Sequence, residues 1–222
     1  MPSTAKITFL ANKADITELW NIHQEVAGQG AGRKYGVEVL NRAAIVFITA
    51  CWESYIEDLA AESFDFLLAN ATSSAAIPPK VRAFASKAIL EQKDSKKLWD
   101  IADSGWRVLL ASHKESTLKR WLGDFNTPKT GQVNDLYIEL LGIKRLSTSW
   151  YWAGIKSSSV ETKLDDFIQL RGDIAHRLKP ANTVNKWKGT NYLAHVSSIV
   201  DRCELAVLLI YRPKPASYRG DA

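Results

Sequence analysis

The feature that most restricts the fold of this chain is one long segment, residues 36–70. Its apolar residues recur three and four positions apart, as they do on one face of an α-helix. These apolar positions are Val37, Leu40, Ala44, Phe47, Ile48, Cys51, Tyr55 and Leu59, and the acidic residues that fall mostly on the other side are Glu53, Glu57, Asp58 and Glu62. The segment is therefore predicted to be a long helix with one buried stripe and one solvated acidic face.

The rest of the chain follows the same helical period. Seven Pro and twelve Gly residues separate its segments, and none of the segments reads as an alternating strand. The sequence predicts an all-α fold, a compact helical bundle with a long first core helix and inserted helices. Further helices are expected over residues 15–27, 79–91, 95–121, 133–141 and 189–211. Another is expected to open with a capping box at Ser158 and Glu161 and to stop by Pro180.

A single domain is expected over residues 1–211, and residues 212–222 are expected to be a disordered tail. The chain is 46% hydrophobic and 24% charged, as in ordinary globular proteins. Its longest apolar run, residues 43–52, is too short to span a bilayer, and its beginning does not resemble a signal peptide. Cys51 and Cys203 lie in apolar stretches and are predicted to be reduced core residues. We expect a cytoplasmic protein with no membrane contact.

The net charge of +5 favours polyanionic partners such as nucleic acid. The four histidines are spread along the chain with no pair at a metal-ligand spacing. No metal and no cofactor is therefore predicted, and His23, His113 and His195 are expected to be surface or half-buried residues.

His176 differs from the other histidines in its surroundings. Arg171 precedes it by five residues, and Arg177 and Lys179 follow it closely. At about 100° per residue, Arg171 and His176 lie about 140° apart on a helix, so both can border one groove. Two such helices meeting across a two-fold axis would form a cationic cleft suited to phosphodiester chemistry. On spacing alone, however, basic residues complementing a helix dipole are the favoured interpretation.

The sequence around this pair favours the catalytic interpretation over the helix-dipole interpretation. Residues 170–177 read Leu-Arg-Gly-Asp-Ile-Ala-His-Arg and resemble the HEPN signature, an Arg, four to six residues and a His, commonly ending in Ile-Ala-His. Residues 40–47 and 50–59 look like the first long helix of the RiboL-PSP-HEPN group. Its middle region is similar to residues 125–128, 140–142 and 149–152. The likeness extends over about residues 37–209.

The resemblance implies an endoribonuclease that works as a homodimer without metal, with its two signature motifs meeting at the interface. The RNA 2′-hydroxyl would attack the adjacent phosphate, leaving a 2′,3′-cyclic phosphate and a 5′-hydroxyl. Arg171 would orient and neutralise the phosphate, and His176 would act in proton transfer or transition-state stabilisation. Proteins of this kind often serve as toxins or in antiviral defence, so an antitoxin or an operon partner protein is expected besides RNA.

Gly172 departs from the signature, in which the residue after the Arg is usually Asn, Asp or His. A glycine costs a helix interior about 1 kcal/mol relative to alanine and brings no side chain to the groove. Asp173 is expected either to take over this polar role or to pair with Arg177 four residues on. Both are therefore predicted to be supporting residues.

Other residues are assigned by their chemistry. The predicted contacts to the RNA backbone are Lys179, Lys186 and Lys188. The tryptophans able to stack on bases are Trp150, Trp152 and Trp187, although a core position is favoured for each.

Two alternatives stay open. The first is a catalytically silent HEPN dimer that binds nucleic acid, nucleotide or a partner protein. The second is an antitoxin-like or purely structural helical subunit.

Overall fold

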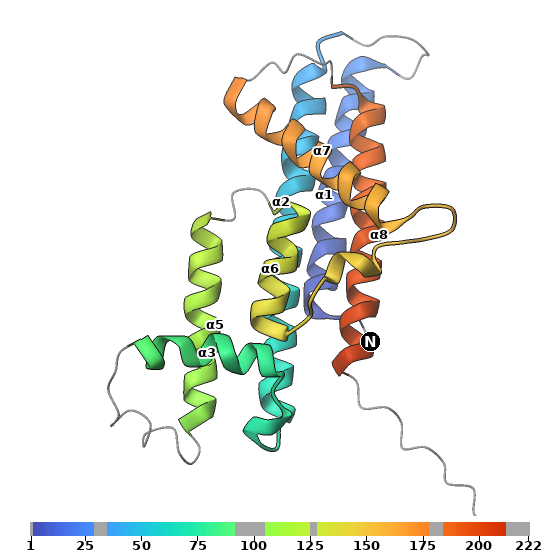
Figure 1. Ribbon diagram of the computed structural model, residues 1–222. Helices are drawn as coiled ribbons and strands as arrows, with labels where there is room; N and C mark the ends of the chain where they lie inside the picture. The colour runs from blue at the N-terminus through green and yellow to red at the C-terminus, as the bar shows by residue number, and fades with distance from the viewer. Residues whose placement is uncertain (1, 29–34, 92–104, 125–127, 178–183, 212–222) are drawn as a thin grey trace, which may run out of the picture.

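The computed structural model describes residues 2–28, 35–91, 105–124, 128–177 and 184–211. These residues form helices and no β-strand beyond one isolated bridge between Trp152 and Ile155, so the predicted all-α bundle is confirmed (Figure 1). The helices are α1 (Thr4–Ala27), α2 (Glu38–Asn70), α3 (Pro79–Glu91), α5 (Gly105–Asp124), α6 (Thr130–Leu141), α7 (Ser157–Arg177) and α8 (Lys186–Tyr211), with short 3₁₀ helices η1 (Ser74–Ala76) and η2 (Leu146–Ser149).

Helix α2 is the centre of the bundle, because α1, α5, α6, α7 and α8 all pack against it. With neighbours on several sides, its buried face is broader than the single predicted stripe. Ile45 and Ile56 are fully buried, although neither belongs to the predicted stripe. Phe47, which was predicted to be buried, is 52% exposed. The predicted acidic face is also not fully solvated, since Glu53 and Glu57 are half-buried.

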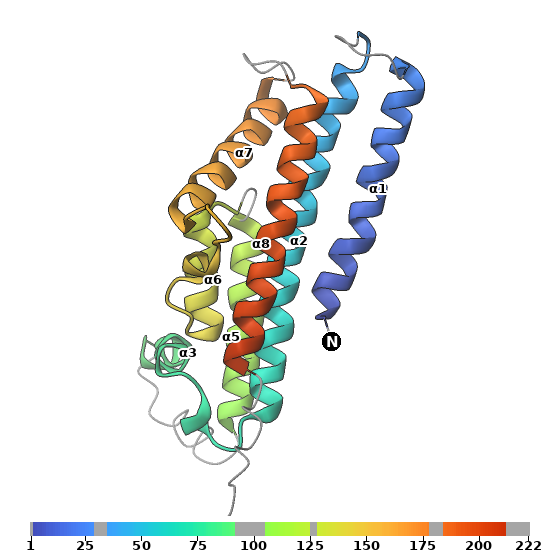
Figure 2. The same ribbon diagram turned by 90° about the vertical axis from the view of Figure 1, so that its right-hand side faces the viewer.

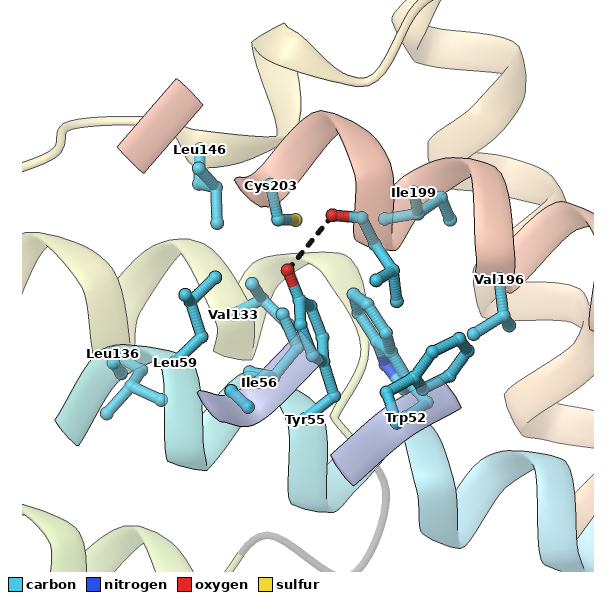
Figure 3. Packing of buried hydrophobic residues seen from close by; sticks show 14 of the residues in the cluster. Trp52, Tyr55, Ile56, Leu59, Val133, Leu136, Leu146, Val196, Ile199 and Cys203 are labelled. Atoms are coloured by element: carbon cyan, nitrogen blue, oxygen red, sulfur yellow. Dashed lines mark hydrogen bonds between the residues drawn. The ribbon is translucent and has the colours of Figure 1, made fainter. Parts of the chain in front are cut away.

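The centre of the core lies where α2 meets α6, α8 and η2 (Figure 3). Trp52 and Tyr55 of α2 point toward α8, and the Tyr55 hydroxyl donates to the backbone carbonyl of Val200 at 2.9 Å. Trp150 is fully buried and donates through Nε1 to Sγ of Cys203 at 3.0 Å. Cys203 is a buried free thiol, as the sequence predicts, and burial is the main cause that raises its pKa.

Helix α1 begins eleven residues before the predicted start. Ser3 caps its first turn, and the carboxylate of Glu204 accepts from the Ser3 amide at 2.6 Å and from its hydroxyl at 2.7 Å. Glu62 accepts from the amides of Thr4 and Ala5, both at 3.1 Å. Carboxylates favour a helix N-terminus because its free N–H groups carry partial positive charge. The prediction was wrong because both carboxylates are remote in sequence.

The predicted capping box is also wrong. Helix α7 starts at Ser157, so Ser158 already lies inside its first turn. The carboxylate of Glu161 instead pairs with Arg145 at 3.2 Å. The spacing of Ser158 and Glu161 fits a capping box, but the Glu161 carboxylate pairs with Arg145 instead of capping the helix.

Two further helices begin three residues before their predicted starts. Helix α6 starts at Thr130, whose amide and hydroxyl donate to Oδ1 of Asp165 at 2.8 and 2.9 Å. Helix α8 starts at Lys186, because Oδ1 of Asn185 accepts from the Lys188 amide at 2.9 Å. Helix α3 has its predicted bounds. The first ten residues of the predicted helix 95–121 and the tail 212–222 lie outside the described residues.

Helix α5 is anchored on the C-terminal end of α2 by Arg107. Its guanidinium donates to the backbone carbonyls of Leu68 and Ala71, both at 2.6 Å. These carbonyls belong to the last turn and cap of α2, where helical partners are lacking. Arg107 therefore fixes where the inserted helices α3 and α5 attach.

Three histidines expected at or near the surface are buried, with His23 4%, His113 9% and His195 5% exposed. His195 Nε2 lies 3.1 Å from the Val160 carbonyl. Burial lowers the pKa of His195 to about 4, against a smaller opposing effect of this hydrogen bond. In the part of the chain that the structure describes, no helix has the length and apolarity needed to cross a membrane.

Candidate functional site

The segment that carries Arg171 and His176 is the C-terminal part of α7. Both ribbon views place this end of α7 at the same end of the bundle as the beginnings of α2 and α8 (Figures 1 and 2). Helix α7 packs on α2 and α8. The buried side chains of Leu164, Ile168 and Ile174 belong to the core cluster and hold α7 against them.

Arg171 is half-buried, and its charge acts on the carboxyl group of Glu53 on α2. Burial raises the pKa of Glu53 to about 7, while the opposite charge of Arg171 lowers it and the like charge of Glu57 raises it. Within the described residues, Oε1 of Glu53 is a buried oxygen without a hydrogen-bond partner. Burial therefore outweighs the opposite charge of Arg171, and the Glu53 carboxyl group changes charge near neutral pH.

A buried tyrosine completes the surroundings of this pair. Tyr192 of α8 is fully buried, and its hydroxyl lies 3.2 Å from the Thr49 hydroxyl. Its ring stacks on Phe167 with centroids 4.2 Å apart and an interplanar angle of 17°. Burial raises the pKa of Tyr192, and both Glu53 and Arg171 affect it. The site thus combines side chains from α2, α7 and α8.

Sequence reasoning missed Glu53 because it was grouped with the solvated acidic side of the long helix. Its burial depends on α7, which follows more than one hundred residues later in the chain. No local pattern in the sequence reports such a contact.

Replacing Glu53 by glutamine is expected to change how stability depends on pH. The folded-state pKa of Glu53 lies above its usual value of 4.5, so the folded protein holds this proton more tightly than the unfolded chain does. Stability from this group is fully present below about pH 4.5 and is lost as the pH rises toward 7. Glu53→Gln replaces the carboxyl group by an amide that is uncharged at every pH, so we expect this variant to be more stable than wild type at pH 8 and nearly equal at pH 4.5.

Urea denaturation at a series of pH values measures this difference. Asp58→Asn is the matched control, because Asp58 is an exposed carboxylate on the same helix. A stability difference between Glu53→Gln and wild type that does not change with pH would contradict the assignment.

His176 lies on the outside of the bundle. Ile174 is 5% exposed and faces the core, whereas Ala175 and His176 in the same turn are exposed. Arg171 is thus held beside α2 and α8 while His176 is open to solvent. Their joint role in catalysis stays a prediction.

The structure describes the surroundings of Asp173 but not the side chain of Arg177, so their supporting roles stay predictions. Oδ1 of Asp173 accepts from Gln169 Nε2 at 3.3 Å, and Gln169 Oε1 accepts from Lys129 of the α6 cap at 3.3 Å. Arg177 is the last residue of α7, and its side chain lies outside the described part of the structure. At Gly172, an added Cβ would meet no atom within 4 Å, so close packing does not explain the glycine.

The predicted RNA contacts lie at the beginning of α8. Lys186 Nζ is 5.9 Å from the centre of the Trp20 ring, and Lys188 is half-buried. Trp187 between them is 69% exposed, so the core position favoured for it is wrong, whereas Trp150 is fully buried. Trp152 is partly buried against the core. Lys179 lies outside the described residues.

Comparison with protein families finds one match over most of the chain. Residues 11–207 match the family described as RiboL-PSP-HEPN, a HEPN-type domain. No curated protein and no solved structure matches the chain. The described residues contain no group of three or more His, Cys, Asp or Glu side chains placed to hold a metal ion.

Proposed function

This chain belongs to the RiboL-PSP-HEPN family, and on that basis we propose that it is a metal-independent endoribonuclease acting as a homodimer. Membership of a HEPN family suggests a nuclease-like or RNA-related function. The observation that carries the finer proposal is the position of the signature on α7, where Arg171 is coupled to Glu53 and His176 is exposed. As with similar proteins, the activity would serve as a toxin or defence effector, restrained by an antitoxin or operon partner.

The chemistry assigned to the two residues is complementary. Arg171 binds the phosphate and neutralises the charge that develops on it as the RNA 2′-hydroxyl attacks. His176 exchanges a proton with the 2′-hydroxyl or with the 5′ leaving oxygen, as imidazoles do near neutral pH. The products are a 2′,3′-cyclic phosphate and a 5′-hydroxyl. Asp173 and Arg177 support the pair from the same helix.

The openness of the site supports the proposed homodimer. An exposed His176 excludes no water, and water-exposed groups give weak electrostatic stabilisation. A second copy facing this end of α7 would cover the histidine and supply a second Arg171 and His176.

The start of α8 supports RNA as the substrate. Trp187 is exposed and is flanked in sequence by Lys186 and Lys188. An exposed aromatic ring among cations suits single-stranded nucleic acid, because the ring stacks on bases while the cations follow the phosphates. Lys179 is proposed as a further phosphate contact from its basic side chain and its position in the sequence alone.

The test is cleavage of an end-labelled RNA by the purified chain in excess EDTA, with analysis of the product ends. We expect cyclic phosphate and 5′-hydroxyl ends. The double variant Arg171→Ala with His176→Ala, purified in parallel, controls for contaminating nucleases. The proposal fails if wild type binds RNA but leaves it intact, or if both proteins give the same products.

Gly172 favours a second candidate, a silent dimer that binds nucleic acid, nucleotide or protein without cutting. A Cβ added at Gly172 would meet no atom within 4 Å, yet the polar side chain usual at this position of the signature is absent. RNA binding without new ends in the same assay would identify this candidate. A monomer in solution, with Arg171 occupied by Glu53 alone, would instead favour the antitoxin-like or structural subunit.

A further inference from the structure

A pocket of about 350 Å³ lies between the inserted helices α3, α5 and α6, outside the signature helix. Helices α3 and α5 lie beside α6, away from α1 (Figures 1 and 2). Pockets that hold small molecules in proteins usually measure about 300–1,000 Å³. Its size therefore suits a single small ligand.

The walls of the pocket have three kinds of chemistry. Phe84 and Leu109 give an apolar wall, and Phe84 is 38% exposed, so its ring is accessible. Ser112 and other hydroxyl groups line another part, and the described lining also contains the cations Lys87 and Arg120. An accessible aromatic ring beside cations and hydroxyls matches a flat base, a phosphate and a sugar.

The polar wall is held in place before any ligand arrives. Glu139 belongs to the lining, and its side chain is 12% exposed. It accepts a short hydrogen bond from Arg120 and one of 3.1 Å from Thr117. The buried His113 lies 3.5 Å from the Thr117 hydroxyl through Nδ1 and 3.3 Å from the Glu139 carbonyl through Nε2. Glu139 thus fixes the Arg120 guanidinium at the wall of the pocket.

The charge of the surrounding segment favours an anion as well. The described parts of this segment, residues 79–91 and 105–124, contain seven of the 29 Lys and Arg residues but three of the 24 Asp and Glu residues. Most of the chain's net charge of +5 is therefore carried by this segment. An excess of positive charge raises the local concentration of anionic ligands.

We propose that this pocket binds a nucleotide unit, with its base on Phe84 and its phosphate on Lys87 and Arg120. The unit comes either from a free nucleotide or from an RNA chain, since both present the same chemistry. The proposal does not depend on RNA cleavage, because binding is measured without turnover.

Calorimetric titration of the full chain with adenosine and uridine 5′-monophosphate tests the free-nucleotide source. Lys87→Ala and Phe84→Ala change exposed side chains, and each is expected to weaken saturable binding at least tenfold. The matched control is Lys119→Ala, because Lys119 is an exposed cation of α5 that does not line the pocket. It is expected to change the affinity less than twofold. His176→Ala is also expected to leave the affinity unchanged.

An RNA oligonucleotide titrated into His176→Ala, alone and combined with Lys87→Ala or Lys119→Ala, tests the other source. If Lys87→Ala lowers the RNA affinity tenfold and Lys119→Ala does not, the nucleotide unit in the pocket belongs to a bound RNA chain. Unchanged RNA affinity together with binding of the monophosphates assigns it to a free nucleotide. The proposal is overturned if neither probe responds to Lys87→Ala, if Lys119→Ala weakens binding equally, or if His176→Ala abolishes monophosphate binding.

Discussion

His176→Ala is expected to lower the rate of RNA cleavage by about 10²- to 10⁴-fold, the usual contribution of a general acid or base. Because His176 is exposed in the last turn of α7, its removal creates no cavity. The melting temperature should therefore remain close to that of wild type. Single-turnover cleavage with excess enzyme measures the chemical step, and circular dichroism follows unfolding.

Arg171→Ala tests the other residue of the predicted catalytic pair. Loss of a group that stabilises charge in the transition state typically costs about 10²- to 10³-fold in rate. Unlike His176, Arg171 is half-buried beside Glu53, so its removal also takes away the charge that lowers the Glu53 pKa. Arg171→Lys keeps the charge and loses the planar fork that binds phosphate, so it should restore the pH dependence of stability but not the rate. Full cleavage by either alanine variant would contradict the assigned roles.

Trp52→Ala is expected to lower the free energy of unfolding by about 3–5 kcal/mol, the usual cost of removing a buried aromatic residue. Trp52 is fully buried in the middle of α2. Its ring meets Trp150 edge-on with centroids 5.9 Å apart, and its Nε1 donates to the Pro128 carbonyl at 3.1 Å. The substitution leaves a cavity between helices that all depend on α2, and it leaves a buried carbonyl without its donor.

Urea denaturation gives this difference as a lower midpoint at an unchanged slope. Trp187→Ala is the control, because the Trp187 ring is 69% exposed and contributes little to the core. A loss below about 1 kcal/mol for Trp52→Ala would mean that the core tolerates the cavity by rearranging, contrary to the packing described.

The sequence predicts those features that depend on neighbouring residues. The length of α2 and the bounds of α3 follow from helical period and from Pro and Gly positions, which are local. The early start of α1 depends on Glu62 and Glu204, and that of α6 depends on Asp165. These partners are remote in sequence, so no window of residues reveals them.

The residues of the candidate site also differ in whether the local sequence predicts them. Arg171 and His176 could be found because their spacing and the residues around them form a continuous motif. Glu53 could not, because its importance arises only when α7 packs on α2 and takes the carboxyl group out of water. The solvated face inferred for α2 was reasonable for an isolated helix and wrong for one surrounded by others.

The contacts of α8 have a consequence for how the protein is made. This helix is the last described element of the chain, yet it packs on α2 and holds the start of α1 through Glu204. A ribosome releases residues in order, so the core around Tyr55 stays incomplete until α8 has emerged. Synthesis itself thus delays assembly of the site between α2, α7 and α8, and nascent chains are expected to expose apolar surface to chaperones during that interval.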